Sequence, residues 1–129
     1  MKLTTCVINF IKDKIRVRIF RGFDGMPGGV MDHFDEFLKW NDGKSDDPRY
    51  MAVAFIFWAK LDLFEDANEA KVPAVKHEHG LGEYAIDVPP VQASVDYEYD
   101  LIRRGRIFIV NAYRLVGRKR VLCDSRHYQ

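Results

Sequence analysis

His77 and His79 are the two residues of this chain whose types and spacing could hold a metal ion. In an extended strand, residues two apart point to the same side, so a His-x-His pair offers two imidazole nitrogens to one ion. A zinc site needs a third protein ligand, for which Asp87, Asp96 and Glu98 are eligible. The simpler interpretation is an exposed polar loop with two ordinary histidines. A metal-dependent hydrolase is therefore an alternative function, although no cofactor is expected.

Residues 20–29 form a second candidate site, with the sequence Phe-Arg-Gly-Phe-Asp-Gly-Met-Pro-Gly-Gly between a strand pattern and a helix pattern. Glycine and proline at this density fix one backbone path. The glycines at the helix N-terminus leave backbone N–H groups unobstructed, which could bind an anion. No lysine follows at the spacing of a phosphate-binding loop, so the alternative is a turn in which Asp24 caps nearby N–H groups. The ligand-binding candidates here are Arg21, Asp24, Gly25, Gly28 and Gly29.

This loop resembles a motif of uncharacterised small proteins found in bacteriophages and prophages. In that group a strand ends in an aromatic-Arg-His-aromatic-Asp-Gly-Tyr-Pro pattern, and a helix follows. The residues that fit the pattern here are Phe20, Arg21, Phe23, Asp24, Gly25 and Pro27, while Gly22 replaces the His and Met26 the Tyr. The residues Asp96-Tyr97-Glu98-Tyr99 resemble the group's late acidic-aromatic strand. The resemblance implies a mobile-element protein that acts inside a host cell, and it implies no particular chemistry.

Charge is distributed unevenly along the chain, although the net charge is only +1. Residues 1–100 contain 12 Lys and Arg against 18 Asp and Glu, whereas residues 101–129 contain 8 against 1. Asp96, Glu98 and Asp100 share one face of a predicted strand and could bind Mg²⁺ or a basic partner. They could instead pair across strands with the basic residues that follow, which is the simpler interpretation. Those basic residues are Arg103, Arg104, Arg106, Arg118, Lys119 and Arg120. If their side chains point outward, the hairpin could bind nucleic-acid phosphates.

Alternating and apolar segments predict the strands that position these groups. Residues 3–11 and 14–21 flank Lys12-Asp13 and predict a β-hairpin. A short strand is indicated within residues 83–88. Later strands are predicted at 94–102, 106–115 and 118–123.

Two helices are predicted between the early and late strands. Apolar residues recur at helical spacing over residues 30–41. Asp47 and Pro48, a good cap and a good first residue, predict a second helix that runs to about Phe64. Residues 50–59 are apolar throughout, so this helix should be buried on most sides.

The expected fold is α+β with the order ββααβββ, one antiparallel sheet and both helices packed on one face. A single domain should span residues 1–123, with a mobile polar tail at 124–129. No run of about 18 apolar residues is present, so no membrane span is expected. Cys6 and Cys123 lie in apolar strands without metal or redox spacing, which favours reduced thiols and a cytoplasmic protein, in the host cytoplasm if the chain is viral.

These observations favour a small non-enzymatic interaction protein that binds a macromolecular partner. No arrangement of Ser, Cys or His indicates a catalytic nucleophile. A protein partner is expected, and nucleic acid is the alternative. A homodimer is also an open alternative, because an outer sheet face carrying Val110 and Tyr113 would need a cover.

Overall fold

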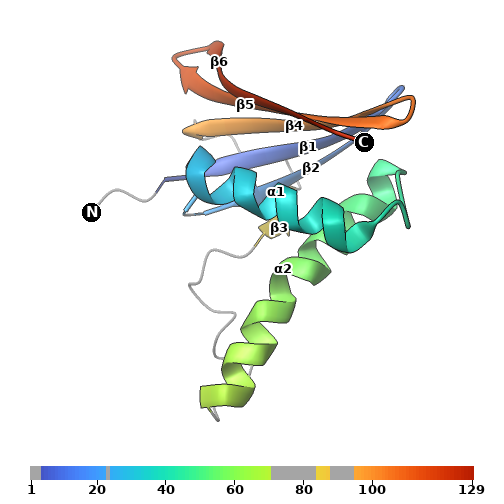
Figure 1. Ribbon diagram of the computed structural model, residues 1–129. Helices are drawn as coiled ribbons and strands as arrows, with labels where there is room; N and C mark the ends of the chain where they lie inside the picture. The colour runs from blue at the N-terminus through green and yellow to red at the C-terminus, as the bar shows by residue number, and fades with distance from the viewer. Residues whose placement is uncertain (1–3, 23, 71–83, 88–94) are drawn as a thin grey trace.

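The computed structural model describes residues 4–22, 24–70, 84–87 and 95–129, and only the backbone of residues 62–70. The elements in chain order are β1 (Cys6–Lys12), β2 (Ile15–Arg21), α1 (Pro27–Asn41), α2 (Pro48–Ala70), β3 (Tyr84–Ile86), β4 (Tyr97–Arg104), β5 (Ile107–Val116) and β6 (Lys119–Tyr128). Figure 1 shows a sheet above two helices, with the second half of α2 extending away from the sheet. The predicted α+β class is confirmed. The described order has one more strand than ββααβββ, and this strand is the short one indicated within residues 83–88, which pairs with β2.

The described strands form one mixed sheet in the order β3-β2-β1-β4-β5-β6. Its central pair, β1 and β4, is parallel, with Cys6 opposite Tyr97 and Lys12 opposite Arg103. The other neighbouring strands are antiparallel. The prediction of a wholly antiparallel sheet was therefore wrong. The alternating pattern of β4 would be the same in a parallel or an antiparallel pair, so it could not predict the direction. Parallel pairing with β1 requires a long connection, which α1 and α2 help to supply.

The last strand also differs from expectation, because residues 124–128 belong to β6 and form no mobile tail. Tyr128 lies opposite Phe108, and Arg126 lies opposite Val110. The Arg126 guanidinium is 2.6 Å from a carboxylate oxygen of Asp35 in α1, and the Tyr128 hydroxyl donates to the same carboxylate. The polar residues that suggested a tail instead contact an acidic residue of α1.

Both helices are longer than predicted. α1 begins at Pro27, because the first helical position needs no N–H donor and suits the fixed φ of proline. α2 continues to Ala70 through residues 65–70, whose composition favours a helix although it is polar. In the part of the chain that the structure describes, no helix combines the length and apolar character needed to cross a membrane.

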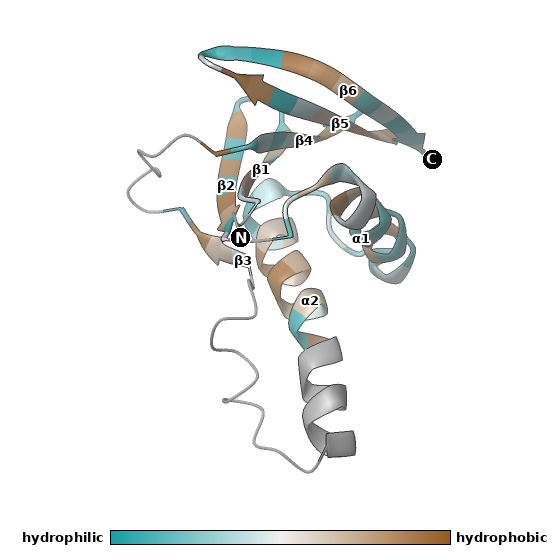
Figure 2. Cartoon of the chain, turned by 90° about the vertical axis from the view of Figure 1, so that its left-hand side faces the viewer, coloured by the Kyte–Doolittle hydropathy of each residue, from teal (hydrophilic) through white to brown (hydrophobic). Residues whose placement is uncertain are grey.

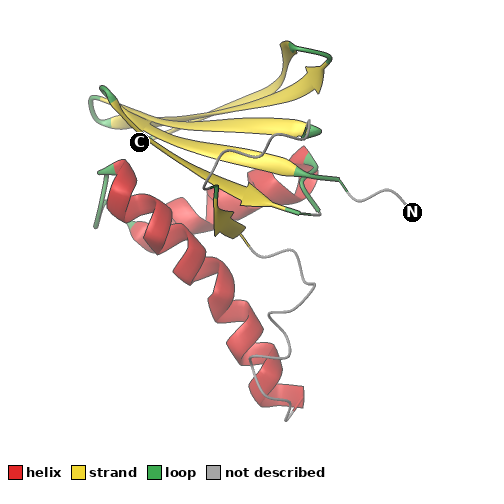
Figure 3. Ribbon diagram, turned by 180° about the vertical axis from the view of Figure 1, so that it is seen from behind, coloured by secondary structure: helices red, strands yellow, loops and turns green. Residues whose placement is uncertain are grey.

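The core lies between the helices and the inward residues of the central strands. Phe55 of α2 is at its centre, with its ring centroid 5.0 Å from that of Phe37 and 5.4 Å from that of Phe34. Ile8 of β1 and Tyr99 of β4 belong to the same buried cluster. Figure 3 shows α1 and α2 together on one side of the sheet, so within the described residues the opposite face of the sheet carries no helix.

Candidate functional site

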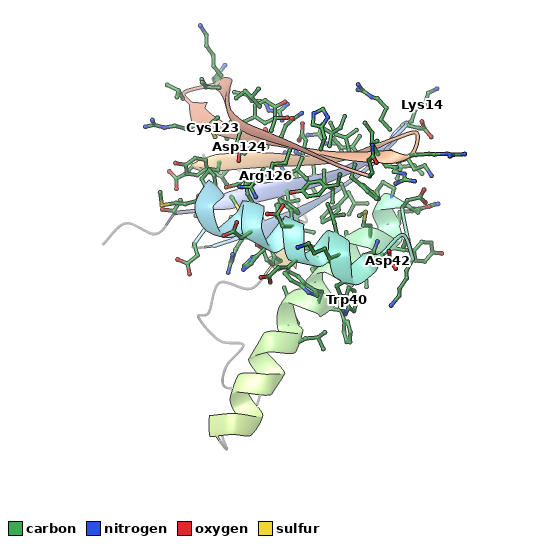
Figure 4. The ribbon with its side chains drawn as sticks, viewed as in Figure 1. Lys14, Trp40, Asp42, Cys123, Asp124 and Arg126 are labelled. Carbon is green, nitrogen blue, oxygen red and sulfur yellow. The ribbon has the colours of Figure 1, made fainter. Side chains whose placement is uncertain are left out.

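An apolar surface where α1 meets α2 is the most conspicuous exposed feature of the described residues. It consists of Trp40, Tyr50, Val53 and Phe57, which are 38%, 69%, 61% and 55% exposed, and we call it the α2 patch. The Trp40 and Phe57 ring centroids are 6.3 Å apart, so the patch is continuous across the two helices. Figure 4 places Trp40 near the end of α1, beside α2.

The α2 patch arises because α2 is apolar on more sides than the sheet covers. Figure 2 shows that the N-terminal half of α2 is largely apolar. Phe55 and Met51 are buried against the sheet and α1, whereas Tyr50, Val53 and Phe57 project outward. The prediction that this helix is buried on most sides was therefore wrong. The sequence showed that α2 has more apolar residues than one buried face needs, but it did not show which of them would be exposed.

The glycine loop is held tightly against the start of β1. A Cβ added to Gly25 would lie 2.8 Å from the Cβ of Cys6 and 2.8 Å from the carbonyl carbon of Thr5. The Gly25 N–H donates to the Thr4 carbonyl oxygen at 3.0 Å, and the Tyr99 hydroxyl donates to the Gly25 carbonyl oxygen at 2.6 Å. Gly25 is therefore explained by close approach and backbone hydrogen bonds.

Of the other predicted loop residues, Asp24 contacts Arg21, whereas Gly28 and Gly29 face open space. Asp24 has a φ of 55°, and its carbonyl oxygen is 3.4 Å from Nη1 of Arg21. A Cβ on Gly28 or Gly29 would meet no atom within 4 Å, so the first turn of α1 is open on that side. α1 has no side-chain cap at its N-terminus. Anion binding at this loop stays a prediction.

Arg21 is oriented by residues that sequence reasoning missed. Its Nη1 is 3.1 Å from the Tyr84 hydroxyl, and its guanidinium carbon lies 4.7 Å from the centroid of that ring. Nδ1 of His33 is also 3.1 Å from the Tyr84 hydroxyl. Burial raises the pKa of Tyr84, so its hydroxyl remains protonated at physiological pH. These three side chains come from β2, α1 and β3, and their separation in the sequence left no local signal.

A network of charged residues lies on the face of the sheet that carries no helix. Asn9 Nδ2 is 2.9 Å from Glu98 Oε2 and 2.9 Å from Asp100 Oδ1. Arg120 Nε is 3.1 Å from Glu98, and its Nη2 is 2.6 Å from Asp100. The Arg120 guanidinium also stacks on Tyr113, 3.7 Å from the ring centroid. The predicted cross-strand pairing of acidic and basic residues is thus formed by Arg120 with two of the three carboxylates.

Two more arginines complete the neutralisation of this network. Arg16 and Arg18 lie 3.7 and 3.9 Å from Oε2 of Glu98. Arg18 also lies 3.2 Å from Asp87, a carboxylate that is buried at the edge of the network. Among the described residues, these three carboxylates face three guanidinium groups, so their charges are closely balanced.

Asp96 does not join Glu98 and Asp100. Its carboxylate accepts a hydrogen bond from the backbone N–H of Thr5 at 2.9 Å. Among the described residues, no group of three His, Cys, Asp or Glu could hold a metal ion. They give no support for the Mg²⁺ site considered at these carboxylates. His77 and His79 lie outside the described residues, so the zinc prediction is untested there.

No protein-family model, curated protein or solved structure matches this chain. The resemblance of the glycine loop to phage-associated proteins therefore stays a prediction.

The basic residues predicted as one nucleic-acid surface are divided by the fold. Arg104 and Arg106 lie at one end of β5, whereas Arg118 and Lys119 lie beyond the other end. β5 has 10 residues, so the two groups are separated by about 30 Å. Arg103 lies at the same end as Arg104 and Arg106, and its guanidinium carbon is 4.5 Å from the centroid of the Phe108 ring.

The two cysteines should differ sharply in reactivity. Cys6 is completely buried, and burial raises the pKa of its thiol to about 12. Cys123 is exposed. We expect an aromatic disulfide reagent at pH 8 to modify one thiol per folded chain and two per unfolded chain, because the thiolate is the reacting species.

Absorbance of the released thiol measures this count. The Cys123→Ser variant should release none while folded and one after unfolding. Rapid reaction of two thiols in the folded wild type would contradict the burial of Cys6.

Proposed function

We propose that this chain is a small non-enzymatic interaction protein that docks a protein through the α2 patch. The exposure of four large apolar side chains in one continuous surface carries the proposal. Because an aromatic side chain presents about 150–250 Å², the exposed fractions correspond to on the order of 400 Å² of apolar surface. A patch of this size is often functional, and aromatic residues are enriched among those that dominate binding energy.

A second copy of this chain is the partner that fits the α2 patch best. Tyr50, Val53 and Phe57 follow one side of α2, and such a stripe is complementary to itself when two helices pack antiparallel about a two-fold axis. An axis near the middle of the stripe sets Tyr50 of one copy against Phe57 of the other and brings Val53 close to its own counterpart. Both copies then cover the same apolar surface.

Charge favours the same antiparallel arrangement. Residues 61–70 of α2 contain four acidic residues and no basic one. The antiparallel arrangement brings this acidic end near the N-terminus of the other α2, where the helix dipole is positive. Lys44 and Arg49 lie near that N-terminus. Asp47 is already paired with Arg49 at 2.6 Å, and Asp46 with Lys12 at 2.9 Å.

The experiment compares glutamate at two apolar positions of equal exposure. Phe57 in the α2 patch is 55% exposed, and Leu122 on the opposite side of the molecule in β6 is 56% exposed. We expect the wild type and Leu122→Glu to be dimers and Phe57→Glu to be a monomer at the same concentration. The loss in association should be about a hundredfold or more, because a symmetric interface contains the changed residue twice.

Light scattering coupled to size-exclusion chromatography measures the mass of each variant. Dissociation by Leu122→Glu alone would place the interface on the sheet and would contradict the proposal. A wild type that stays monomeric at sub-millimolar concentration would also contradict it.

A further inference from the structure

The hairpin turns of the described strands share one feature that the α2 patch does not explain. Each turn has two residues, and the second residue is basic. The turns are Asp13-Lys14, Gly105-Arg106 and Gly117-Arg118. Their first residues have φ values of 53°, 61° and 64°, as the tight turns that join twisted antiparallel strands require. The second residues, Lys14, Arg106 and Arg118, are all exposed.

The parallel pairing of β1 with β4 brings two of these turns to the same end of the sheet. Lys12 is opposite Arg103, so the turns that follow them are neighbours. Figure 1 shows the blue β1–β2 turn beside the orange β4–β5 turn, far from the β5–β6 turn. With the strand order β2-β1-β4-β5, the midpoints of the two turns are two strand spacings apart, about 10 Å.

Lys12, Lys14, Arg103, Arg104 and Arg106 therefore form one surface, which we call the basic edge. Its nearest carboxylate on the helix side, Asp46, lies 2.9 Å from Lys12 and 3.7 Å from Arg103 and is neutralised by them. The hydrogen bond from Lys12 lowers the pKa of Asp46, which keeps it ionised. Asp13 is the other carboxylate at these turns.

Three cations of the basic edge are available to a ligand. Lys14, Arg104 and Arg106 are exposed and form no ion pair with the described part of the chain. Between the two turns is a cleft of about 490 Å³. Its lining consists of Ile11, Lys12, Asp13, Ile102, Arg103, Arg104 and Gly105, with no aromatic side chain. The cleft thus offers positive charge but no platform for stacking a base.

We propose that the basic edge binds the phosphodiester backbone of a nucleic acid without base specificity. Phosphates recur every few ångströms along a strand, so cations about 10 Å apart can contact different phosphates of one strand. Lys14 supplies a point charge, and the arginines supply planar forks that suit phosphate oxygens. Backbone contacts of this kind hold a strand but do not specify its sequence. The proposal does not depend on the α2 patch.

The test measures binding of labelled oligonucleotides by fluorescence anisotropy between about 50 and 200 mM salt. Single-stranded RNA, single-stranded DNA and duplex DNA, each in two unrelated sequences, are the separate arms. The edge variant is Lys14→Ala with Arg104→Ala and Arg106→Ala. The matched control removes the same charge at the opposite end of the sheet, through Arg114→Ala with Arg118→Ala and Lys119→Ala. All six of these side chains are exposed, so both variants should fold, as circular dichroism will show.

The wild type and the control should bind at least one kind of strand, with an affinity that falls steeply with salt and hardly depends on sequence. The edge variant should bind tenfold or more weakly and lose roughly two to three units of the slope of log affinity against log salt. Equal losses in both variants would overturn the proposal, as would the absence of binding by the wild type at the lowest salt. Anionic phospholipid vesicles that displace the oligonucleotide at equal phosphate concentration would also overturn it, in favour of a membrane surface.

Discussion

Replacing Phe55 by alanine is expected to lower the free energy of unfolding by about 3–5 kcal/mol. Phe55 is completely buried, and its ring centroid is 4.7 Å from that of Tyr84 and 5.8 Å from that of Trp58, in addition to its contacts with α1. Rigid aromatic neighbours on every side cannot collapse into the space that the ring leaves. The total free energy of unfolding of a domain of this size is about 5–15 kcal/mol, so the variant should unfold at a much lower urea concentration.

Phe57→Ala is the matched control, since it makes the same change two residues along the same helix. Phe57 is 55% exposed, so at a protein concentration low enough to keep the chain monomeric the loss of its ring should change the free energy of unfolding by less than about 1 kcal/mol. Urea unfolding followed by circular dichroism gives both values. Similar losses for the two variants would contradict the assignment of Phe55 to the core and Phe57 to the surface.

Gly25→Ala is the second change with a large expected effect. The added Cβ would lie 2.8 Å from the carbonyl carbon of Thr5, and backbone cannot move aside as a flexible side chain can. Relief of the clash must stretch the hydrogen bonds of Gly25 to Thr4 and Tyr99. We expect a loss of about 3 kcal/mol or more in the free energy of unfolding, from overpacking and from weakened buried hydrogen bonds.

Gly28→Ala distinguishes this clash from a general effect of glycine. A Cβ on Gly28 would meet no atom within 4 Å, and Gly28 is in the first turn of α1. Alanine has a higher helix propensity than glycine, so this variant should be as stable as the wild type or slightly more stable. The thermal midpoints of the two variants measure the difference. A Gly25→Ala protein that melts with the wild type would show that the loop is not held against β1.

Local patterns in the sequence predicted most of the elements, and the long-range pairing decided the rest. Alternating and apolar segments placed β1, β2, β4 and β5, and the Asp47-Pro48 pair marked the start of α2. The direction of β4 relative to β1 had no local signal, because alternation is identical in parallel and antiparallel pairs. The polar sequence around Arg126 and Tyr128 predicted a tail exposed to solvent. The contacts of these two residues with Asp35 explain why β6 instead continues to Tyr128.

The candidate sites were predictable where one strand carried them. Glu98 and Asp100 share a face because they are two residues apart in β4, and pairing with a downstream arginine followed from their charge. The basic edge was only half visible in the sequence. Lys14 joins Arg106 through the parallel pairing, which brings together turns that are about 90 residues apart.

The role proposed for the α2 patch is tested most directly by sedimentation velocity of the wild type and of Phe57→Ala from micromolar to sub-millimolar concentration. The wild type should shift from monomer to dimer as its concentration rises. Phe57→Ala should sediment as a monomer at every concentration and keep the helix content of the wild type. A wild type that sediments as one chain at every concentration would contradict the account, and so would a Phe57→Ala protein that associates as tightly as the wild type.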